Sequence, residues 1–409
     1  MTGLFGGTFD PFHQAHRVLA REALRQLGLE ELIVMPVGRP PPKERRTNFA
    51  SYRYEMAWLG VEGLAGVFVS DDEIREAGID YTYHTVLRLK KKYGIKELLL
   101  LSGSDVLMSI DSWHRPADLL KEVSLAVAIR GRDDRLRVEK RAEAGGLRYG
   151  TRVRLFDMPA MDLSASMIRD LTLSGGDIGG LCPPGVVDFI RRYRPYDWGE
   201  AFECLSDADW QDLLDLEETA WPFLSRERRL HSVSVAQYAA RLAALNGENC
   251  KLAASAGLLH DLAKELDGPR LEELALRYVQ LFHQDLPLEY LRGDLAHGPA
   301  SAVMAAELLG TQDTSLAQAI AWHSTARPGM TVLGEILFLA DKIAYDRNFG
   351  QLEEIRSLAE GGDLATAMKR CLEEVFEALD REGKKPCSLS IEAYKKYMNS
   401  GQMPAGRLD

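Results

Sequence analysis

A glycine-rich turn followed by two histidines lies at the start of the chain. The apolar run Thr2–Phe5 leads into Gly6-Gly7-Thr8-Phe9-Asp10-Pro11-Phe12-His13-Gln14-Ala15-His16. Glycines let a backbone approach a ligand closely, and the amides at a helix N-terminus favour an anion. His13 and His16 share a face on a first helical turn, where two imidazoles can hold phosphates and stabilise charge on a transferred phosphoryl group. Alone, histidines at this spacing are more often surface or capping residues; with the turn, they predict a phosphate site.

Histidines and aspartates that could hold metal ions recur in the second half of the chain. They are His231, His260, Asp261, His297, His323 and Asp341. Neutral imidazoles and carboxylates suit iron, manganese, cobalt or zinc. An adjacent His-Asp pair at a helix end can give one metal two ligands, and its carboxylate can bridge to a second metal. Two such metals can together activate a water and neutralise a phosphate. The ordered set therefore predicts a metal site, although each residue alone would more often be a core or surface group.

The first half alternates short apolar runs with helical patterns, which predicts an α/β fold with a doubly wound parallel sheet and helices on both faces. The expected strands are Thr2–Phe5, Leu32–Val37, Val67–Val69, Leu98–Leu101, Leu125–Ile129 and Val153–Phe156. Helical patterns occupy Ala15–Leu27, Tyr83–Tyr93 and Ser164–Leu173.

The pattern changes after Tyr193-Arg194-Pro195, and from Asp207 on it predicts helices only. The expected helices are Leu213–Trp221, Leu230–Leu245, Cys250–Lys264, Leu271–Phe282, Ala300–Leu309, Ser315–His323, Val332–Ile343, Leu364–Leu379 and Ile391–Met398. We expect domains at 1–197 and 226–400. The segment 198–225 between them is either a linker helix or the first helix of the second domain.

The composition is that of a soluble globular protein with two or three domains. The chain has 409 residues, of which 27% are charged and 46% hydrophobic, which argues against disorder and against a fibrous protein. A net charge of −11 provides no global basic field for nucleic acid. Residues 1–198 hold 29 Lys and Arg against 27 Asp and Glu, whereas 199–409 hold 21 against 34. Either two domains with different ligands or an acidic, solubilising surface fits this asymmetry.

The cysteines and the N-terminus point to a cytoplasmic protein. The five cysteines form no CxxC pair and are odd in number, so we expect neither a disulfide framework nor a zinc ribbon, and a reducing cytosol fits best. The start has no basic region before an apolar stretch, and no run reaches ~18 apolar residues. We therefore expect no signal peptide, no membrane span and no nucleic-acid or membrane partner, while the oligomeric state is left open.

Two motifs resemble those of the nucleotidylyltransferase superfamily. The glycine turn with its two histidines resembles the HxGH signature, with Ala15 where the family usually has glycine. Leu163–Arg169 resembles the second motif, a serine-capped helix that carries an arginine. Ser164 or Ser166 can cap this helix, while Arg169 can reach a triphosphate.

Within this superfamily, residues 1–197 resemble nicotinate-nucleotide adenylyltransferase. The similar segments are Pro36–Lys43, Tyr81–Thr85, Leu101–Asp105 with Trp113, Arg130–Arg132 and Pro184–Ile190. Pro42 and His84 depart from the family pattern, which affects substrate contacts rather than the reaction type. A pantetheine-phosphate or glycerol-phosphate enzyme is an alternative that Tyr81–Thr85 and Trp113 disfavour.

The resemblance implies adenylyl transfer from Mg²⁺-bound ATP to nicotinate mononucleotide. It gives catalytic roles to His13, His16 and Arg169. Binding roles are implied for Gly6, Gly7, Thr8, Phe9, Lys43, Thr82, Thr85, Gly103, Asp105, Trp113, Arg130, Ser164 and Ser166. From the residue types, Asp105 could bind ribose hydroxyls and Trp113 could stack on a pyridine ring.

The histidines and aspartates resemble the HD superfamily of metal-dependent phosphohydrolases, in a two-metal version. His260–Lys264, His323–Met330 and Ala340–Ile343 are similar to YqeK-type symmetrical diadenosine tetraphosphate hydrolases, over roughly 226–400. Tyr345 and Asp346 depart from the proline and asparagine that are usual there.

This second resemblance implies two divalent metals, with iron first and manganese or cobalt as substitutes. His231, His260, Asp261 and Asp341 would hold one metal, and Asp261 would bridge to a second metal held by His297 and His323. Lys264 and Arg327 would act as catalytic cations, and Arg347 would bind substrate. Hydrolysis of an alarmone or a cyclic dinucleotide, or a catalytically silent module that binds nucleotide and regulates its neighbour, are the alternatives.

Overall fold

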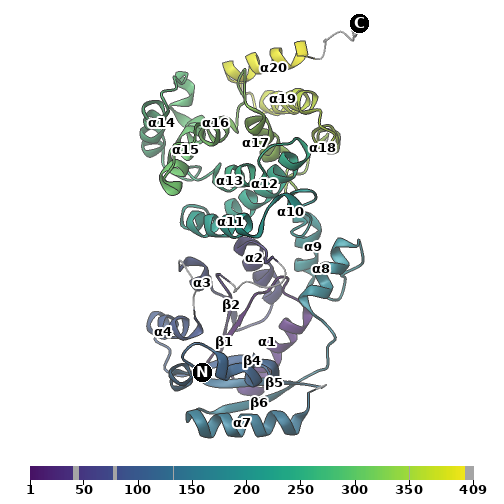
Figure 1. The fold of residues 1–409 in the computed structure, drawn as a ribbon. Coiled ribbons are helices and arrows are strands. Elements are labelled where there is room, and N and C mark those ends of the chain that lie inside the picture. The colour runs from purple at the N-terminus through teal and green to yellow at the C-terminus, as the bar shows by residue number, and fades with distance from the viewer. Residues whose placement is uncertain (40–45, 77–80, 132, 350, 401–409) are drawn as a thin grey trace. The chain divides into compact units, whose positions relative to one another are not determined.

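The computed structural model describes residues 1–39, 46–76, 81–131, 133–349 and 351–400 (Figure 1). The chain divides into two compact units, Met1–Tyr196 and Asp197–Asp409. No helix among the described residues combines the length and the apolar character needed to cross a membrane.

The first unit is built on a parallel sheet of six strands in the order β3-β2-β1-β4-β5-β6. The strands are β1 (Thr2–Gly7), β2 (Glu31–Pro36), β3 (Val67–Val69), β4 (Leu98–Gly103), β5 (Ser124–Arg130) and β6 (Val153–Met158). All six expected strands are present, and the predicted doubly wound α/β class is confirmed. The strand order reverses at β1, which pairs with both β2 and β4. Ligands bind at the carboxyl ends of the strands beside such a reversal.

Among the described residues of this unit, nine helices and one 3₁₀ turn accompany the sheet. They are α1 (Gln14–Leu27), α2 (Ala50–Val61), α3 (Asp72–Arg75), α4 (Thr82–Tyr93), α5 (Ser104–Ser109), the 3₁₀ turn η1 (Ile110–Ser112), α6 (Pro116–Glu122), α7 (Arg135–Tyr149), α8 (Ala165–Leu173) and α9 (Pro184–Tyr193). A buried cluster joins alternate residues of β1, β2, β4 and β5 to α4, α5, α6 and α7. Helix α1 connects β1 to β2, and α2 connects β2 to β3. Both connections come before the strand order reverses, so α1 and α2 cover the face of the sheet opposite to α4, α5, α6 and α7.

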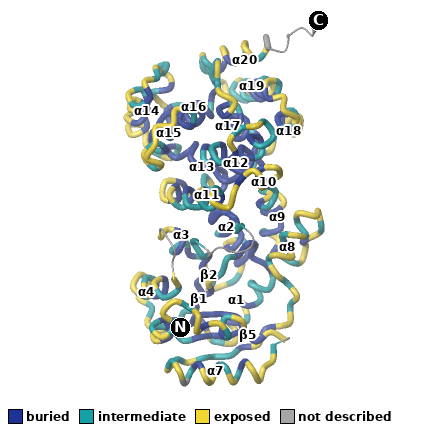
Figure 2. Tube along the Cα trace, viewed as in Figure 1, coloured by how far each residue is buried: buried dark blue, intermediate teal, exposed yellow. Residues whose placement is uncertain are grey.

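The sequence patterns predict helices between the strands but do not locate α2 or α7, for opposite reasons. Nine of the twelve residues of α2 are buried, so its sequence lacks the apolar stripe of a surface helix. The sequence of α7 is highly charged, and Val138 and Ala142 are its contribution to the buried core. Figure 2 shows the contrast between the dark, buried tube of α2 and the mostly exposed α7.

The second unit is helical, and its described residues contain no strand. Its helices are α10 (Ala201–Cys204), α11 (Asp207–Ala220), η2 (Trp221–Phe223), α12 (Arg226–Leu245), α13 (Cys250–Leu259), α14 (Gly268–Phe282), η3 (Leu288–Tyr290), η4 (Gly293–Ala296), α15 (His297–Leu309), α16 (Thr314–Trp322), α17 (Val332–Ile343), α18 (Leu352–Glu360), α19 (Leu364–Arg381) and α20 (Ser388–Ser400). Each expected helix overlaps one of these, and α10 and α18 were not anticipated. Residues 198–225 form α10, α11 and η2, and α11 packs on α13.

Two of the five cysteines are bonded to each other. Cys204 at the end of α10 and Cys250 at the start of α13 form a disulfide, whereas Cys182, Cys371 and Cys387 are free. The two bridged residues lie 46 positions apart. A single bridge of this kind has no local sequence pattern, so only the fold reveals it.

Candidate functional site

The first unit has a cleft of about 830 Å³ beside the carboxyl end of β1. Segments that follow β1, β5 and β6 line it, together with the first turns of α1 and α8. Among its lining residues are Thr8, Phe9, His13, His16, Arg130, Ser164, Ser166 and Arg169, all of which the sequence analysis placed in one site. The cleft lies where a doubly wound sheet binds its ligand.

His13 and His16 form a stacked pair at the start of α1. Their ring centroids are 3.7 Å apart, and the His13 backbone N–H donates to Nδ1 of His16 over 3.2 Å. Burial, reinforced by nearby positive charge, lowers the pKa of His13 to about 4 and holds that of His16 well below its usual range. Both rings are therefore neutral near pH 7. Because Nδ1 of His16 accepts a hydrogen bond, its proton resides on Nε2, which can donate to a phosphate oxygen.

Arg169 links the second motif to the first loop. The hydroxyl of Ser164 accepts a backbone N–H at the start of α8 and so caps the helix. One Arg169 nitrogen donates to the carbonyl of Asp10 over 2.5 Å, and another donates to Ser166 Oγ over 3.2 Å. The Asp10 carboxylate in turn accepts the backbone N–H of Asn48 over 3.1 Å. The guanidinium therefore stands beside the histidine loop, as a phosphate ligand should.

Predicted acceptor-binding residues gather at the ends of β4 and β5. The Arg130 guanidinium lies 3.6 Å from the Asp105 carboxylate. A Cβ on Gly103 would lie 2.3 Å from that same carboxylate, so a larger residue here would displace the Asp105 side chain. Trp113 packs partly buried on the apolar cluster of the unit. Thr85 is buried, and its hydroxyl donates to Glu73 Oε1 over 2.7 Å.

Three other predicted residues of this site lie at the ends of elements. Gly6 and Gly7 end β1, and Thr82 begins α4. A Cβ on Gly7 would meet the Phe9 ring at 2.8 Å, so glycine permits the turn into the cleft. Lys43 lies outside the described residues.

Arg53 of α2 is a positioning residue that sequence reasoning missed. Its side chain is 1% exposed. The guanidinium donates to the carbonyls of Asn48 (2.9 Å), Val37 (2.6 Å), Gly38 (2.9 Å) and Thr8 (3.3 Å). It thereby ties the loop after β1 to the loop after β2. A lone arginine in a helix without an apolar stripe gives no signal of this role.

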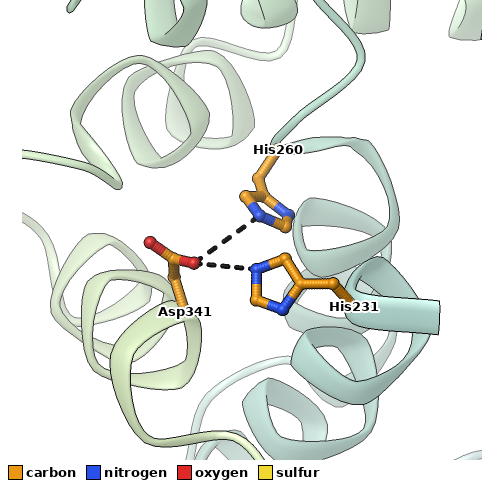
Figure 3. A group of neighbouring side chains, drawn as sticks. All are labelled: His231, His260 and Asp341. Atoms are coloured by element: carbon orange, nitrogen blue, oxygen red, sulfur yellow. Dashed lines mark hydrogen bonds and ion pairs between the residues drawn. The ribbon is translucent and has the colours of Figure 1, made fainter. Parts of the chain in front are cut away.

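The six predicted metal ligands converge inside the second unit. His231 lies on α12, His260 and Asp261 directly follow α13, His297 begins α15, His323 follows α16, and Asp341 lies on α17. All six are buried. Two overlapping groups have ligand atoms within 4.8 Å of one another, namely His231, His260 and Asp341, and His260, Asp261 and His323. Figure 3 shows the imidazoles of the first group directed at the Asp341 carboxylate.

Three of these histidines have the same tautomer for the same reason. In each, Nδ1 lies within hydrogen-bonding distance of the backbone carbonyl three residues earlier, and since a carbonyl only accepts, Nδ1 must carry the proton. The histidines are His260, His297 and His323, and the carbonyls are those of Gly257, Asp294 and Ile320. In the neutral rings Nε2 is thus left with a lone pair, which is the form that binds a metal.

These lone pairs face carboxylates and one another. Nε2 of His297 and Nε2 of His323 are 3.2 Å apart, and each is 3.5 Å from Asp261 Oδ1. Nε2 of His260 is 3.5 Å from Asp261 Oδ2 and 3.8 Å from Asp341 Oδ1, with no hydrogen-bond partner among the described residues. Buried acceptors that face one another are costly unless a cation lies between them. The donor set therefore fits divalent metals, and the two Asp261 oxygens face different histidines, as a bridging ligand requires.

His231 completes the cluster through two carboxylates. Its Nδ1 is 2.8 Å from Asp346 Oδ2, and its Nε2 is 3.0 Å from Asp341 Oδ1. Burial opposes charging of the ring, but the two carboxylates raise the pKa of His231 to about 9. Asp346 is thus the outer partner that orients this imidazole, a role that metal-binding histidines commonly require.

Positively charged side chains surround the ligands. Lys264 Nζ lies 3.3 Å from the His297 ring nitrogens, and an Arg347 nitrogen lies 2.9 Å from Asp341 Oδ1. The sequence analysis predicted both residues but missed Arg228 and Lys342. Arg228 NH1 is 2.9 Å from Asp261 Oδ2, and Lys342 Nζ is 2.5 Å from Asp341 Oδ2. Arg228 precedes His231 by three positions and shares its helical face, but arginines are common at such spacings, so the sequence gives no distinct signal.

Arg327, the third predicted cation, contacts Gln284 and Trp322. One of its nitrogens donates to Gln284 Oε1 over 3.3 Å, and its guanidinium lies 5.1 Å from the Trp322 ring centroid. It therefore stands beside the helix end that carries His323 rather than in the ring of cations on the ligands.

Glycines next to two ligands let their helices approach closely. A Cβ on Gly257 of α13 would lie 2.5 Å from the backbone of Ala236 on α12, and one on Gly298 of α15 would lie 2.5 Å from the Ala321 carbonyl on α16. Real Cβ atoms essentially never approach so closely. The two contacts bring the helices of His231 and His260, and those of His297 and His323, within reach of common metals.

Comparison with known proteins gives the two units separate relationships. Residues 4–171 match the cytidylyltransferase-like family, and 228–346 match the HD domain. A "probable nicotinate-nucleotide adenylyltransferase" of Clostridium perfringens is 33% identical over 195 residues, which cover 47% of this chain and 96% of that protein. The Streptococcus pyogenes protein of the same name is 32% identical over 195 residues, covering 47% of this chain and 87% of its own.

A solved structure from Clostridium acetobutylicum, described as a "predicted HD superfamily hydrolase involved in NAD metabolism", is 28% identical, with a TM-score of 0.42, and the match covers 48% of this chain and 99% of that one. The motifs in the first cleft and the matches to curated relatives agree. The chain therefore belongs to the nicotinate-nucleotide adenylyltransferase family through its N-terminal half and carries an HD domain in its C-terminal half.

Proposed function

We propose that the first unit transfers the adenylyl group of ATP to nicotinate mononucleotide, which gives deamido-NAD and pyrophosphate. The observation that carries this proposal is the meeting of His13, His16 and Arg169 in one cleft. It is supported by the 33% identity to a relative named for this activity.

The chemistry requires positioning and charge stabilisation rather than a protein base. An oxygen of the mononucleotide phosphate attacks the α-phosphorus of ATP, the bond from that phosphorus to the β-phosphate oxygen breaks, and pyrophosphate leaves. The neutral His16 ring donates from Nε2 to a phosphate oxygen, and Arg169 supplies a fixed positive charge. A Mg²⁺ ion that arrives with ATP would neutralise part of the triphosphate charge.

His16→Ala should lower kcat for adenylyl transfer by about 100-fold, because it removes one donor to the transition state. Pyrophosphate release from ATP and nicotinate mononucleotide measures this. Gln14→Ala is the matched control, since Gln14 shares the helical turn but does not line the cleft. Equal turnover in the two variants would remove His16 from the mechanism.

The acceptor preference is proposed to be nicotinate over nicotinamide mononucleotide. A nicotinate carboxylate accepts hydrogen bonds from backbone N–H groups and from Arg130, whereas an amide NH₂ would oppose them. Measured kcat/KM values for the two mononucleotides test this, and equal values would contradict it.

We further propose that the second unit is a metal-dependent phosphohydrolase that cleaves diadenosine tetraphosphate symmetrically, so that the chain is bifunctional. The carrying observation is the set of buried Nε2 lone pairs that face Asp261 and Asp341. His231, His260, Asp261 and Asp341 would hold one metal, and Asp261, His297 and His323 the other. The bound metals, with iron as first choice, would activate a water and neutralise phosphate charge.

The remaining side chains prepare the site for a polyphosphate. Carbonyls fix the tautomers of three imidazoles, and Lys264 and Arg347 place positive charge beside the ligands. Water adds to one of the two central phosphorus atoms, the central P–O–P bridge breaks, and both halves leave as ADP. Arg327 remains a candidate contact for an outer phosphate.

A product assay on the purified chain tests this second proposal. Diadenosine tetraphosphate with Fe²⁺, Mn²⁺ or Co²⁺ should give ADP alone. AMP plus ATP would mean asymmetric cleavage, and full activity after exhaustive chelation would mean that the six residues are not a metal site.

A further inference from the structure

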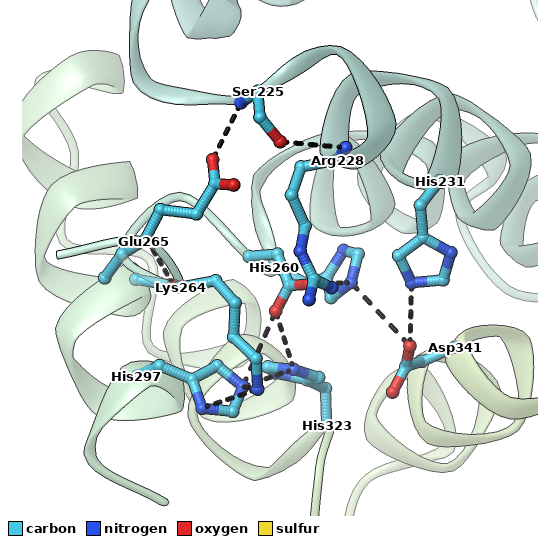
Figure 4. A network of polar contacts seen from close by, with 12 residues as sticks. Ser225, Arg228, His231, His260, Lys264, Glu265, His297, His323 and Asp341 are labelled. Carbon is cyan, nitrogen blue, oxygen red and sulfur yellow. Dashed lines mark hydrogen bonds and ion pairs between the residues drawn. The ribbon is translucent and has the colours of Figure 1, made fainter. Parts of the chain in front are cut away.

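The start of α12 is fastened to the turn that carries the His-Asp pair. The Ser225 backbone N–H donates to Glu265 Oε2 over 2.7 Å, and Ser225 Oγ accepts the Arg228 backbone N–H over 3.4 Å. Arg228 therefore stands on a fixed first turn, one helical step from His231. Figure 4 shows its side chain extending from α12 towards His260.

The Arg228 side chain is partly exposed to solvent, and its guanidinium contacts the buried ligand cluster. Its NH1 lies 2.9 Å from Asp261 Oδ2, and the arginine side chain is 35% exposed whereas that of Asp261 is 4% exposed. Nε and NH2 of Arg228 donate no hydrogen bond to any residue that the structure describes. One edge of the guanidinium is thus engaged, and other donors are left for a ligand.

The charges around the ligands favour an anionic ligand there. Arg228, Lys264, Lys342 and Arg347 contact the ligand set, against the carboxylates Asp261, Asp341 and Asp346. Divalent ions on Asp261 and Asp341 would compete for the charge of these carboxylates and leave the four cations without full counter-charge. A substrate with several phosphates would supply it, and a guanidinium is suited to phosphate oxygens.

We propose that Arg228 is a substrate-binding residue of this hydrolase site, which holds Asp261 through NH1 and a phosphate oxygen through its remaining donors. The proposal rests on the phosphohydrolase function proposed above and adds a residue that the sequence resemblance did not supply. The competing interpretation is that Arg228 merely orients Asp261. The two differ in what should change when the guanidinium is removed.

The test uses sodium tripolyphosphate as a probe of phosphate binding. Isothermal titration calorimetry is performed on the full-length chain loaded with Mn²⁺, without Mg²⁺ or ATP. The component of binding that chelation abolishes is assigned to the second unit. The variants are Arg228→Ala and Arg228→Lys, with Arg229→Ala as the matched control. Arg229 lies on the same turn, but its guanidinium stacks on Trp221 with 3.8 Å to the ring centroid.

Arg228→Ala should weaken tripolyphosphate binding by about 10- to 100-fold, as expected for one lost charge-assisted hydrogen bond, with bound manganese unchanged. Arg228→Lys should recover part of the affinity. Affinity equal to that of Arg229→Ala, or a loss no larger than the loss of manganese, would overturn the proposal. If affinity falls as expected but the wild type does not hydrolyse diadenosine tetraphosphate, the role of Arg228 holds and the proposed reaction fails.

Discussion

The histidines of the two sites present the same ring nitrogen, Nε2, in different protonation states, because different backbone groups engage Nδ1. In His16, Nδ1 accepts a backbone N–H, so Nε2 carries the proton and serves as a donor. In His260, Nδ1 donates to the Gly257 carbonyl, so Nε2 keeps a lone pair. The first arrangement suits a phosphate and the second suits a metal. The sequence reveals the histidines and their spacing but not whether the backbone group at Nδ1 is a donor or an acceptor.

The buried histidine pair predicts a specific acid sensitivity. His13 has a pKa of about 4 in the folded chain and an ordinary value near 6.5 when unfolded. Below pH 6.5 the unfolded chain therefore takes up the proton first, and the unfolding free energy falls as the pH drops towards 4. One group contributes at most about 1.4 kcal/mol per pH unit.

We therefore expect His13→Asn to flatten the pH dependence of stability between pH 6.5 and 4. Denaturant unfolding at several pH values measures the unfolding free energy. The transition of the first unit is identified as the one that added ATP shifts. Above pH 7 the two proteins should show no difference in slope. A variant as acid-sensitive as the wild type would contradict the neutral state assigned to His13.

The cations around the metal ligands also belong to the residue scale. The ordered His and Asp residues predicted the ligand set, because their types and order are visible in one dimension. Arg228 and Lys342 were missed although one is three positions from His231 and the other adjoins Asp341. Arginines and lysines are common on any helix, so spacing alone cannot separate them from solvated charges.

At the scale of elements, the way in which a segment is buried decides whether its sequence pattern reveals it. The strands β2, β4 and β5 contain continuous apolar runs because a parallel sheet is covered on both faces, and all six strands were predicted. The buried helix α2 was not located from its sequence, because it is buried on most sides and therefore shows no apolar stripe. Its Arg53, with four carbonyl partners, is invisible to periodicity for the same reason.

Arg53→Met should lower the free energy of unfolding of the first unit by about 2–5 kcal/mol, because it leaves buried carbonyls without donors. Arg53→Lys should keep more stability, yet a single ammonium cannot reach both loops in the same way. We expect this variant to raise KM for ATP while kcat changes less. Chemical denaturation and initial rates measure these effects, and an Arg53→Lys enzyme with wild-type kinetics would argue against a positioning role.

The contact between α12 and α13 gives another prediction at this scale. Gly257→Ala places a methyl group where the Ala236 backbone already lies, so the helices must separate. Overpacking of this kind costs about 1–3 kcal/mol. Because His231 and His260 lie on either side of the contact, bound metal should also decrease.

Metal analysis and thermal unfolding measure both effects of Gly257→Ala. Gly268→Ala is the control, since a Cβ there meets no atom within 4 Å. If Gly257→Ala retains full metal and stability, the close approach of the two helices is not what sets the ligand spacing.

In the whole molecule, the two proposed phosphate chemistries fall in separate units. The first unit holds neutral imidazoles, a cleft and an arginine for a nucleotide triphosphate. The second holds carboxylates and imidazoles for metals. The acidic excess of residues 199–409 does not extend to the immediate surroundings of the metal ligands, where four cations make contact. Overall charge therefore does not report the charge at this site.

Because the sites lie in separate units, single substitutions should separate the activities. Asp261→Ala removes the carboxylate whose two oxygens face different histidines. It should cost bound metal and abolish hydrolysis of diadenosine tetraphosphate, while adenylyl transfer to nicotinate mononucleotide stays within about twofold of wild type. His16→Ala should give the reverse pattern, with metal content unchanged. Both activities are measured on each full-length variant together with metal content. If Asp261→Ala also abolished adenylyl transfer, the two sites would have to act as one, and the assignment of separate chemistries to the two units would fail.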